Sequence, residues 1–239
     1  MSVLFITGTD TDVGKTVATV LISDCLREHG RHFVPFKPVQ TGAVLQEGKW
    51  FAPDILTYGL SLDDELQPAN YLLKTPCSPH LAASLEEMTI EPKRLTQSVG
   101  QLERTYDGVV VEGAGGLYVP LTIDGFCLID WMEELKAPVI LVTRTGVGTI
   151  NHTLLSIEAM KSRGIPIAGL LFNELVPQET GITEDNMRMI ALLSDVPVIG
   201  IIPYQDDIHD TLTDPVKRKA CYKQWNYKIV QEALQDGNK

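Results

Sequence analysis

Basic residues are scarce in this 239-residue sequence. Lys and Arg number 20 against 31 Asp and Glu, so the formal net charge is −11. Nucleic acids and anionic membrane surfaces are bound largely through clustered Lys and Arg. The charge balance therefore argues against either of them as the main partner, and we expect small-molecule ligands instead.

Cysteine is also sparse, and the four cysteines form no metal-binding pattern. Cys25, Cys77, Cys127 and Cys221 lie far apart, with no C-x-x-C pair and no histidine at ligand spacing. This argues against a zinc site and indicates reduced thiols, because cytosolic proteins rarely carry structural disulfides. The first residues have no basic leader of the kind found in signal peptides. We therefore expect a cytoplasmic protein.

Long hydrophobic runs are missing as well. The apolar runs at 137–142 and 165–172 are far shorter than the roughly 18 residues that a membrane span needs. Hydrophobic residues at 44% and charged residues at 21% are close to the average of globular proteins. A chain of this length most often folds as one domain. We expect a single domain over residues 1–239 and no membrane partner.

Short runs rich in Val and Ile alternate with longer mixed stretches. This pattern is typical of buried parallel strands separated by helices that cover both faces of a sheet. The sequence therefore predicts an α/β fold of three layers with a central, mainly parallel sheet. We place strands at 3–7, 32–37, 108–112, 138–143, 166–172 and 197–202, and helices at 15–29, 92–104, 149–163 and 184–193.

Two stretches fall outside this alternation. Residues 41–90 have no long periodic run and contain several prolines, so we expect an excursion above the carboxyl edge of the sheet, where α/β folds bind ligands. The stretch 206–239 is polar, and we expect part of it to fray.

A phosphate-binding loop follows the first predicted strand. Residues 7–16 read T-G-T-D-T-D-V-G-K-T and lead directly into an apolar helical start. Gly14, Lys15 and Thr16 supply the backbone N–H groups, the phosphate-binding ammonium and the magnesium-binding hydroxyl of a P-loop. The match is a variant, because Thr9 stands where the standard spacing has its first glycine. The strand before it and the helix after it favour a P-loop over a chance match.

Two carboxylates inside this loop, Asp10 and Asp12, are unusual beside a polyanion. Each must have a cationic partner or point away from the phosphates. Either one of them contacts a substrate amine or the shell of a magnesium ion, or they are solvated or capping carboxylates. The sequence leaves both interpretations open.

A lysine and an aspartate in the next segment are further candidates. Lys37 lies between two prolines at the end of the second predicted strand, beside the phosphate loop. Its restricted backbone suits a lysine whose positive charge is held near the negative charge that develops on phosphate oxygens during transfer. The alternative is a surface lysine. Asp54, which follows Pro53, is a candidate magnesium ligand, with a helix N-cap as the alternative.

The third predicted strand continues as V-V-V-E-G-A-G-G at 109–116. An apolar strand that ends in a carboxylate has the form of a Walker B element, so Glu112 is a candidate magnesium ligand. The glycines after it let the backbone approach a ligand closely. Together with the phosphate loop, this segment indicates phosphoryl transfer. Asn173 ends the fifth predicted strand, where its amide either reads an adenine edge or belongs to a turn.

Five segments together resemble the dethiobiotin synthetase family. They are G-T-D-T-D-V-G-K-T at 8–16, K-P-V-Q-T-G at 37–42, S-P-H at 78–80, V-E-G-A-G-G at 111–116 and G-T-I-N-H at 148–152. The resemblance covers residues 8–204 and implies a P-loop NTPase-like fold. It also implies a ligase of biotin biosynthesis that uses Mg-ATP, CO2 and 7,8-diaminononanoate to make dethiobiotin, through a carbamate and its mixed anhydride with phosphate.

The resemblance also implies roles for single residues. Lys15 and Lys37 are then catalytic, and Thr16, Asp54 and Glu112 hold magnesium. The nucleotide contacts implied are Asp12, Val13, Gly14, Lys15, Thr16, Val17, Asp54, Glu112, Gly113, Ala114, Gly115, Asn173, Glu174, Pro203, Tyr204 and Gln205. The substrate contacts implied are Thr11, Thr41, Gly115, Gly116, Gly148 and Asn151, the last two from the second subunit of a homodimer.

Two other classes of protein compete with this interpretation. A partitioning or assembly ATPase of the same fold carries a second, signature lysine in its phosphate loop, but this sequence has Asp10 there. A carboxylate cannot stabilise the phosphate of a neighbouring subunit. A nucleotide-binding module without enzymatic activity is the other rival, and phosphate release measured with and without the diamine would distinguish it from a ligase.

Overall fold

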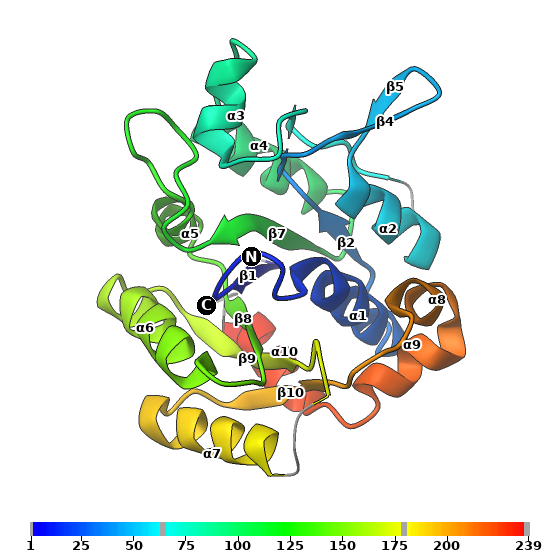
Figure 1. Ribbon diagram of the computed structural model, residues 1–239, viewed down its shortest axis with the longest axis vertical. Coiled ribbons are helices and arrows are strands. Elements are labelled where there is room, and N and C mark those ends of the chain that lie inside the picture. The colour runs from blue at the N-terminus through cyan, green and yellow to red at the C-terminus, as the bar shows by residue number, and fades with distance from the viewer. Residues whose placement is uncertain (1, 63–65, 178–180, 237–239) are drawn as a thin grey trace.

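The computed structural model describes residues 2–62, 66–177 and 181–236. Within them, six strands form one parallel sheet, which Figure 1 shows at the centre of the molecule. The predicted parallel sheet of an α/β fold is therefore confirmed. In spatial order the strands are β10 (Val198–Ile202), β9 (Ile167–Asn173), β8 (Val139–Arg144), β1 (Val3–Gly8), β7 (Gly108–Gly116) and β2 (Phe33–Phe36).

Helices cover both faces of this sheet, because side chains along each buried strand alternate between the faces. Val3 and Phe5 of β1 enter one layer of the core, whereas Leu4 and Ile6 enter the other. The first layer packs against α3 (Pro79–Leu85), α4 (Pro92–Leu102), α5 (Leu128–Leu135), α6 (Thr149–Ser162) and α7 (Ile182–Ser194). The second packs against α1 (Lys15–Glu28), α2 (Pro53–Leu62), α8 (Ile208–Thr213), α9 (Pro215–Tyr222) and α10 (Tyr227–Asp236).

Two small sheets lie within and directly before the excursion expected at 41–90. The strand β3 (Val39–Gln40) pairs in parallel with β6 (Tyr71–Leu72). The strands β4 (Val44–Gln46) and β5 (Lys49–Phe51) form an antiparallel hairpin that projects from the body in Figure 1. This hairpin leads directly into α2. The segment from the end of β2 through the hairpin thus connects the central sheet to a helix that packs on α1.

The polar C-terminal stretch forms helices up to residue 236. Residues 237–239, at the end where fraying is expected, lie outside the described part of the chain, so that expectation stays a prediction. The apolar residues of the stretch are few but well placed. Tyr222, Trp225 and Leu234 are buried in the second core layer. The Trp225 indole donates a hydrogen bond to the Ile201 carbonyl at 2.9 Å, which fastens this segment to β10. No helix in the described ranges is long and apolar enough to cross a membrane.

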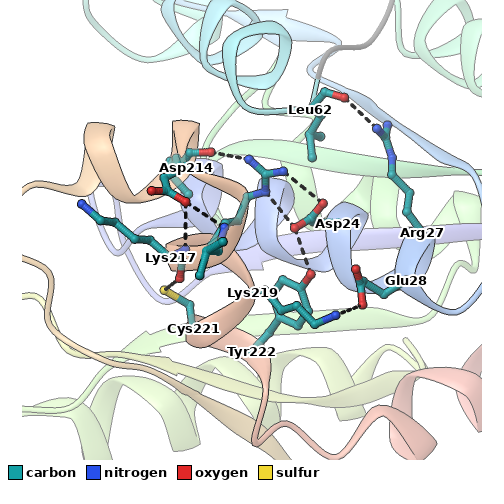
Figure 2. Close-up of polar contacts among 12 residues, drawn as sticks. Asp24, Arg27, Glu28, Leu62, Asp214, Lys217, Lys219, Cys221 and Tyr222 are labelled. Carbon is teal, nitrogen blue, oxygen red and sulfur yellow. Dashed lines mark hydrogen bonds and ion pairs between the residues drawn. The ribbon is translucent and has the colours of Figure 1, made fainter.

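A buried ion pair fastens α9 to α1. Arg218 donates from Nε and Nη2 to the two carboxylate oxygens of Asp24, at 2.7 and 3.4 Å, and from Nη1 to the Leu212 carbonyl at 2.7 Å. The Tyr222 hydroxyl donates to the same carboxylate at 2.9 Å, as Figure 2 shows. Burial and Asp24 both raise the pKa of Tyr222, so this hydroxyl remains protonated and able to donate.

Candidate active site

The phosphate loop follows β1, and its backbone geometry depends on Gly14. This residue has a φ of 94° and caps the N-terminus of α1. Asn173 donates from Nδ2 to the Val13 carbonyl at 3.0 Å, and a Cβ on Gly14 would lie 2.0 Å from that nitrogen. A side chain at position 14 is therefore excluded both by φ and by the close approach of Asn173. The predicted strand, loop and helix of a P-loop are all present.

Lys15 and Lys37 bring two buried positive charges to this loop. The Lys15 ammonium donates to the Asp10 carbonyl at 2.8 Å. Burial, assisted by the nearby Lys37, lowers the pKa of Lys15 to about 8. Burial would also lower the pKa of Lys37, but the carboxylates of Glu112 and Asp54 raise it above its ordinary value. At neutral pH Lys37 is thus firmly charged, and Lys15 loses its proton more easily.

Two carboxylates hold the Lys37 ammonium. Its Nζ lies 2.5 Å from Glu112 Oε1 and 2.9 Å from Asp54 Oδ2. Burial alone would raise the pKa of Asp54, but the pairing with Lys37 and hydrogen bonds from neighbouring side chains lower it, so the carboxylate is ionised. Lys37 is buried, so it is not a surface lysine, and Asp54 is the second residue of α2, so it is not an N-cap.

Glu112 accepts hydrogen bonds from side chains of three different segments. Lys37 and Thr16 both donate to Oε1, Thr16 at 3.0 Å, while the Tyr58 hydroxyl donates to Oε2 at 2.5 Å. Burial and the charge of Glu112 raise the pKa of Tyr58 well above its ordinary value, so this hydroxyl stays protonated. The sequence interpretation missed Tyr58. The available signal was its position four residues after Asp54, a spacing that places two side chains on one helix face.

The oxygen atoms around Lys37 fit a magnesium ion. Thr16, Asp54 and Glu112 offer hydroxyl and carboxylate oxygens, which are the ligands that Mg2+ prefers. The two carboxylates already share one cation, the Lys37 ammonium, and Thr16 Oγ1 is in contact with one of them. No group of three or more His, Cys, Asp or Glu side chains forms a metal site in the ranges described. The remaining ligands would come from phosphate oxygens and water, as is usual for Mg2+.

A cavity of about 890 Å3 opens beside these groups. This volume is within the range of small-molecule sites. Of the candidate substrate residues, Thr11, Thr41 and Gly115 line the cavity, and Gly116 lines a neighbouring pocket together with Thr11. Gly148 and Asn151 are at the N-terminus of α6 and do not line this cavity in the described residues.

Several of the residues implied as nucleotide contacts gather at the ends of β9 and β10. The Glu174 backbone N–H donates to the Ile202 carbonyl at 3.0 Å, and the Tyr204 N–H donates to the Glu174 carboxylate at 3.4 Å. Asn173, in contrast, is 4% exposed and donates to the phosphate loop. Asn173 thus has a structural contact that the sequence did not predict, and its contact with adenine stays a prediction.

The Asp10 carboxylate has a cationic neighbour, Arg144. This arginine, the last residue of β8, lies 3.9 Å from the Asp10 carboxylate and donates to the Thr11 carbonyl at 3.3 Å. Asp10 also accepts the Thr11 backbone N–H at 2.7 Å. Asp10 therefore helps to shape the turn that carries Thr11. The sequence interpretation missed Arg144, although its position at the carboxyl end of a strand beside β1 was a usable signal.

The chain is similar to several known proteins. Residues 2–211 match a protein-family model described as an AAA domain. The ATP-dependent dethiobiotin synthetase of Halalkalibacterium halodurans is 49% identical over 232 residues, which cover 96% of this chain and 96% of that protein. The enzyme of the same name from Anoxybacillus flavithermus is 48% identical over 206 residues, which cover 85% of this chain and 92% of that protein.

Solved structures show a similar fold. The septum site-determining protein MinD complexed with Mg-ADP from Pyrococcus horikoshii has a TM-score of 0.58 and 20% sequence identity, covering 96% of this chain and 94% of that chain. A ParA family ATPase from Chlorobium tepidum has a TM-score of 0.54 and 16% identity, covering 98% and 97%. At this level of identity the similarity supports the P-loop fold and nothing finer.

Proposed function

Because the chain belongs to the AAA domain family and, within it, to the ATP-dependent dethiobiotin synthetases, we propose how its residues carry out the reaction of that family. The protein is a dethiobiotin synthase, a C–N bond-forming ligase that uses ATP with Mg2+. Its substrates are 7,8-diaminononanoate and CO2, and its products are dethiobiotin, ADP and phosphate. One observation supports the residue roles most strongly: Lys37 is paired with Asp54 and Glu112 beside the phosphate loop.

The proposed reaction has three steps. One amine of the substrate attacks CO2 and loses a proton, which gives a carbamate. A carbamate oxygen then attacks the γ-phosphorus of ATP, and the bond to the bridging oxygen breaks, so ADP leaves. The second amine attacks the carbonyl carbon of this mixed anhydride, loses a proton and expels phosphate, which closes the ureido ring. No step needs a covalent bond to the protein, so catalysis rests on positioning and on charge.

The two lysines are assigned to different parts of the nucleotide. Lys15, at the start of α1, would contact the β- and γ-phosphates, as the lysine of a P-loop does. Lys37 would neutralise charge on the phosphoryl group during its transfer, and its raised pKa keeps it protonated for this task. Thr16, Asp54 and Glu112 would hold magnesium, which supplies positive charge to the phosphate oxygens.

The substrate and the rest of the nucleotide are assigned to the walls of the site. We assign the diamine and its carbamate to Thr11, Thr41, Gly115 and Gly116, and their lining of the two adjoining pockets supports this. Further nucleotide contacts are assigned to Asp12, Val13, Gly14, Val17, Gly113, Ala114, Asn173, Glu174, Pro203, Tyr204 and Gln205.

We also propose that the enzyme is a homodimer in which Gly148 and Asn151 of one subunit contact the carboxylate end of the other subunit's substrate. Apolar side chains exposed near this helix start support the proposal, since Val147 is 96% exposed and Leu155 57%. Backbone N–H groups at a helix N-terminus are also suited to bind a carboxylate. Light scattering at micromolar concentration tests the oligomeric state.

The domain organisation and the cellular location are proposals as well. We propose that residues 1–239 act as one ATP-binding unit and that the enzyme works in the cytoplasm. All four cysteines are free thiols, which fits a reducing compartment.

Incubation with Mg-ATP, bicarbonate and 7,8-diaminononanoate tests the reaction directly. We expect a product with the mass of dethiobiotin, together with phosphate release that depends on the diamine. The matched control is Lys37→Met, which should bind nucleotide and form little product. Phosphate release at the same rate without the diamine would contradict the ligase assignment.

A further inference from the structure

We propose that Tyr58 is a positioning residue that holds the Glu112 carboxylate in place for magnesium. The proposal rests on the assignment of Glu112 as a magnesium ligand. The Tyr58 hydroxyl donates to Glu112 Oε2 at 2.5 Å, and its side chain is 2% exposed. Lys37 and Thr16 both contact the other oxygen, Oε1. Tyr58 thus occupies one oxygen of the carboxylate and leaves the other oxygen to the groups that bind cations and phosphates.

The position of Tyr58 in α2 strengthens this assignment. Asp54 and Tyr58 are four residues apart, so they lie on one face of the helix, separated by a rise of about 6 Å. Asp54 contacts the Lys37 ammonium, and that ammonium in turn contacts Glu112. A single helix therefore carries one candidate magnesium ligand and fixes the other. Movement of α2 would displace both carboxylates together.

The ring and the hydroxyl of Tyr58 have separate surroundings. The ring belongs to the core layer that includes Ile55 and Leu62 of the same helix, so it contributes to packing. The hydroxyl contacts a carboxylate that is itself 1% exposed. Without this donor, a buried carboxylate oxygen would lose a strong hydrogen bond and the carboxylate could turn. Replacement by phenylalanine removes the hydroxyl's contacts, with Glu112 and with the Thr19 side chain, and retains the packing of the ring.

Calorimetry with a non-hydrolysable ATP analogue tests the role of the hydroxyl. The dissociation constant is measured in Mg2+ and in EDTA, and the ratio of the two gives the gain in affinity due to magnesium. Tyr58→Phe should reduce this gain by about 10- to 100-fold, the usual cost of losing a group that orients a metal ligand. The affinity in EDTA should not change, because the phosphate loop does not contact the hydroxyl.

Tyr222→Phe is the matched control. It too removes a tyrosine hydroxyl that donates to a carboxylate, but this carboxylate, Asp24, is not in the site. It should leave the magnesium-dependent gain unchanged. In a Glu112→Gln background, Tyr58→Phe should alter the gain by less than about twofold, since the hydroxyl acts through Glu112.

Three results would overturn the proposal: an unchanged gain in Tyr58→Phe, an equal loss of affinity in EDTA, or loss of the folded state, which would assign the hydroxyl to stability alone. The outcome is independent of the reaction. If wild-type protein forms no dethiobiotin but its magnesium-dependent gain still falls in Tyr58→Phe, the proposed function fails and the role of Tyr58 stands.

Discussion

Replacing Arg218 with methionine should strongly destabilise the fold while leaving the nucleotide site intact. The guanidinium side chain is 8% exposed and the Asp24 side chain 15%, so their pairing is largely shielded from water. Arg218 makes two bonds to this carboxylate and one to the Leu212 carbonyl, and Figure 2 shows Asp24 and Tyr222 at this junction of α1 and α9. Methionine retains most of the aliphatic packing and removes the charge.

The size of the effect follows from the buried charge that remains. Loss of one partner of a buried ion pair costs about 3–5 kcal/mol, because the other charge is left without compensation. Tyr222 can satisfy only part of the Asp24 carboxylate. For a chain of about 150–250 residues, each kcal/mol lowers Tm by about 2–4 °C. The expected fall in Tm for Arg218→Met is therefore about 6–20 °C.

Thermal unfolding followed by circular dichroism measures this change, with Lys219→Met as the matched control. Lys219 is the next residue of α9 and also pairs with α1, through Glu28, but both side chains are about half exposed. An exposed pair contributes at most about 1 kcal/mol, so the control should shift Tm by only a few degrees. Asp24→Asn combined with Arg218→Met should be less destabilising than Arg218→Met alone, because no charge is then left buried.

A fall in Tm of Arg218→Met no larger than that of Lys219→Met would refute this reasoning. Below its melting transition, Arg218→Met should bind an ATP analogue as wild type does. Asp24 lies nine residues after Lys15 on α1, a distance of about 14 Å along the helix axis.

Three further predictions concern the nucleotide site. Lys37→Met should lower turnover by at least about 100-fold but change the affinity for an ATP analogue much less, because its charge acts mainly in the transition state. Equal fold losses in the rate of phosphate release and in the affinity measured by calorimetry would contradict this. The free-protein pKa of Lys15 is about 8 and a bound triphosphate favours its ammonium form. The affinity for an ATP analogue, measured in EDTA, should therefore be constant below pH 8 and fall above it by up to about tenfold per pH unit. An affinity that does not change up to about pH 9.5 would contradict this role of the Lys15 ammonium. Gly14→Ala should weaken nucleotide binding by about tenfold or more, because its Cβ would lie 2.0 Å from Asn173 Nδ2 at a φ of 94°. Gly30 is also at positive φ, but among the described residues no atom beyond its chain neighbours lies within 4 Å of an added Cβ. Gly30→Ala should therefore bind nucleotide normally, and equal binding by both variants would refute the steric argument.

Much of the fold was predictable because buried parallel strands are nearly continuous in apolar residues. Each of the six predicted strand segments overlaps a strand of the sheet. The proximity of Lys37 and Glu112 was also within reach of sequence reasoning, whereas Asp54 is on α2 and depends on the packing of that helix. Strands of a parallel sheet end at one edge, so residues that follow different strands gather there.

Other contacts depend on packing that no short motif encodes. Tyr58 reaches Glu112 because α2 turns back onto α1 after the β4–β5 hairpin, and neither α2 nor the hairpin has a long periodic run. Asn173 reaches the phosphate loop across 160 positions of sequence. The C-terminal helices are polar over most of their surface, so a few buried residues, such as Tyr222 of α9 and Val230 of α10, determine that they fold.

The distance in sequence between the two partners of the α1–α9 ion pair also matters during synthesis on the ribosome. Asp24 and Arg218 are 194 positions apart. At elongation rates of about 5–20 residues per second, roughly 10–40 s pass before the arginine is made. Throughout that time the Asp24 carboxylate of the nascent chain has no arginine to pair with. The apolar residues that α9 buries in the folded protein are also not yet covered by that helix. The helix that begins at the phosphate loop is thus translated among the first elements and completed by one of the last.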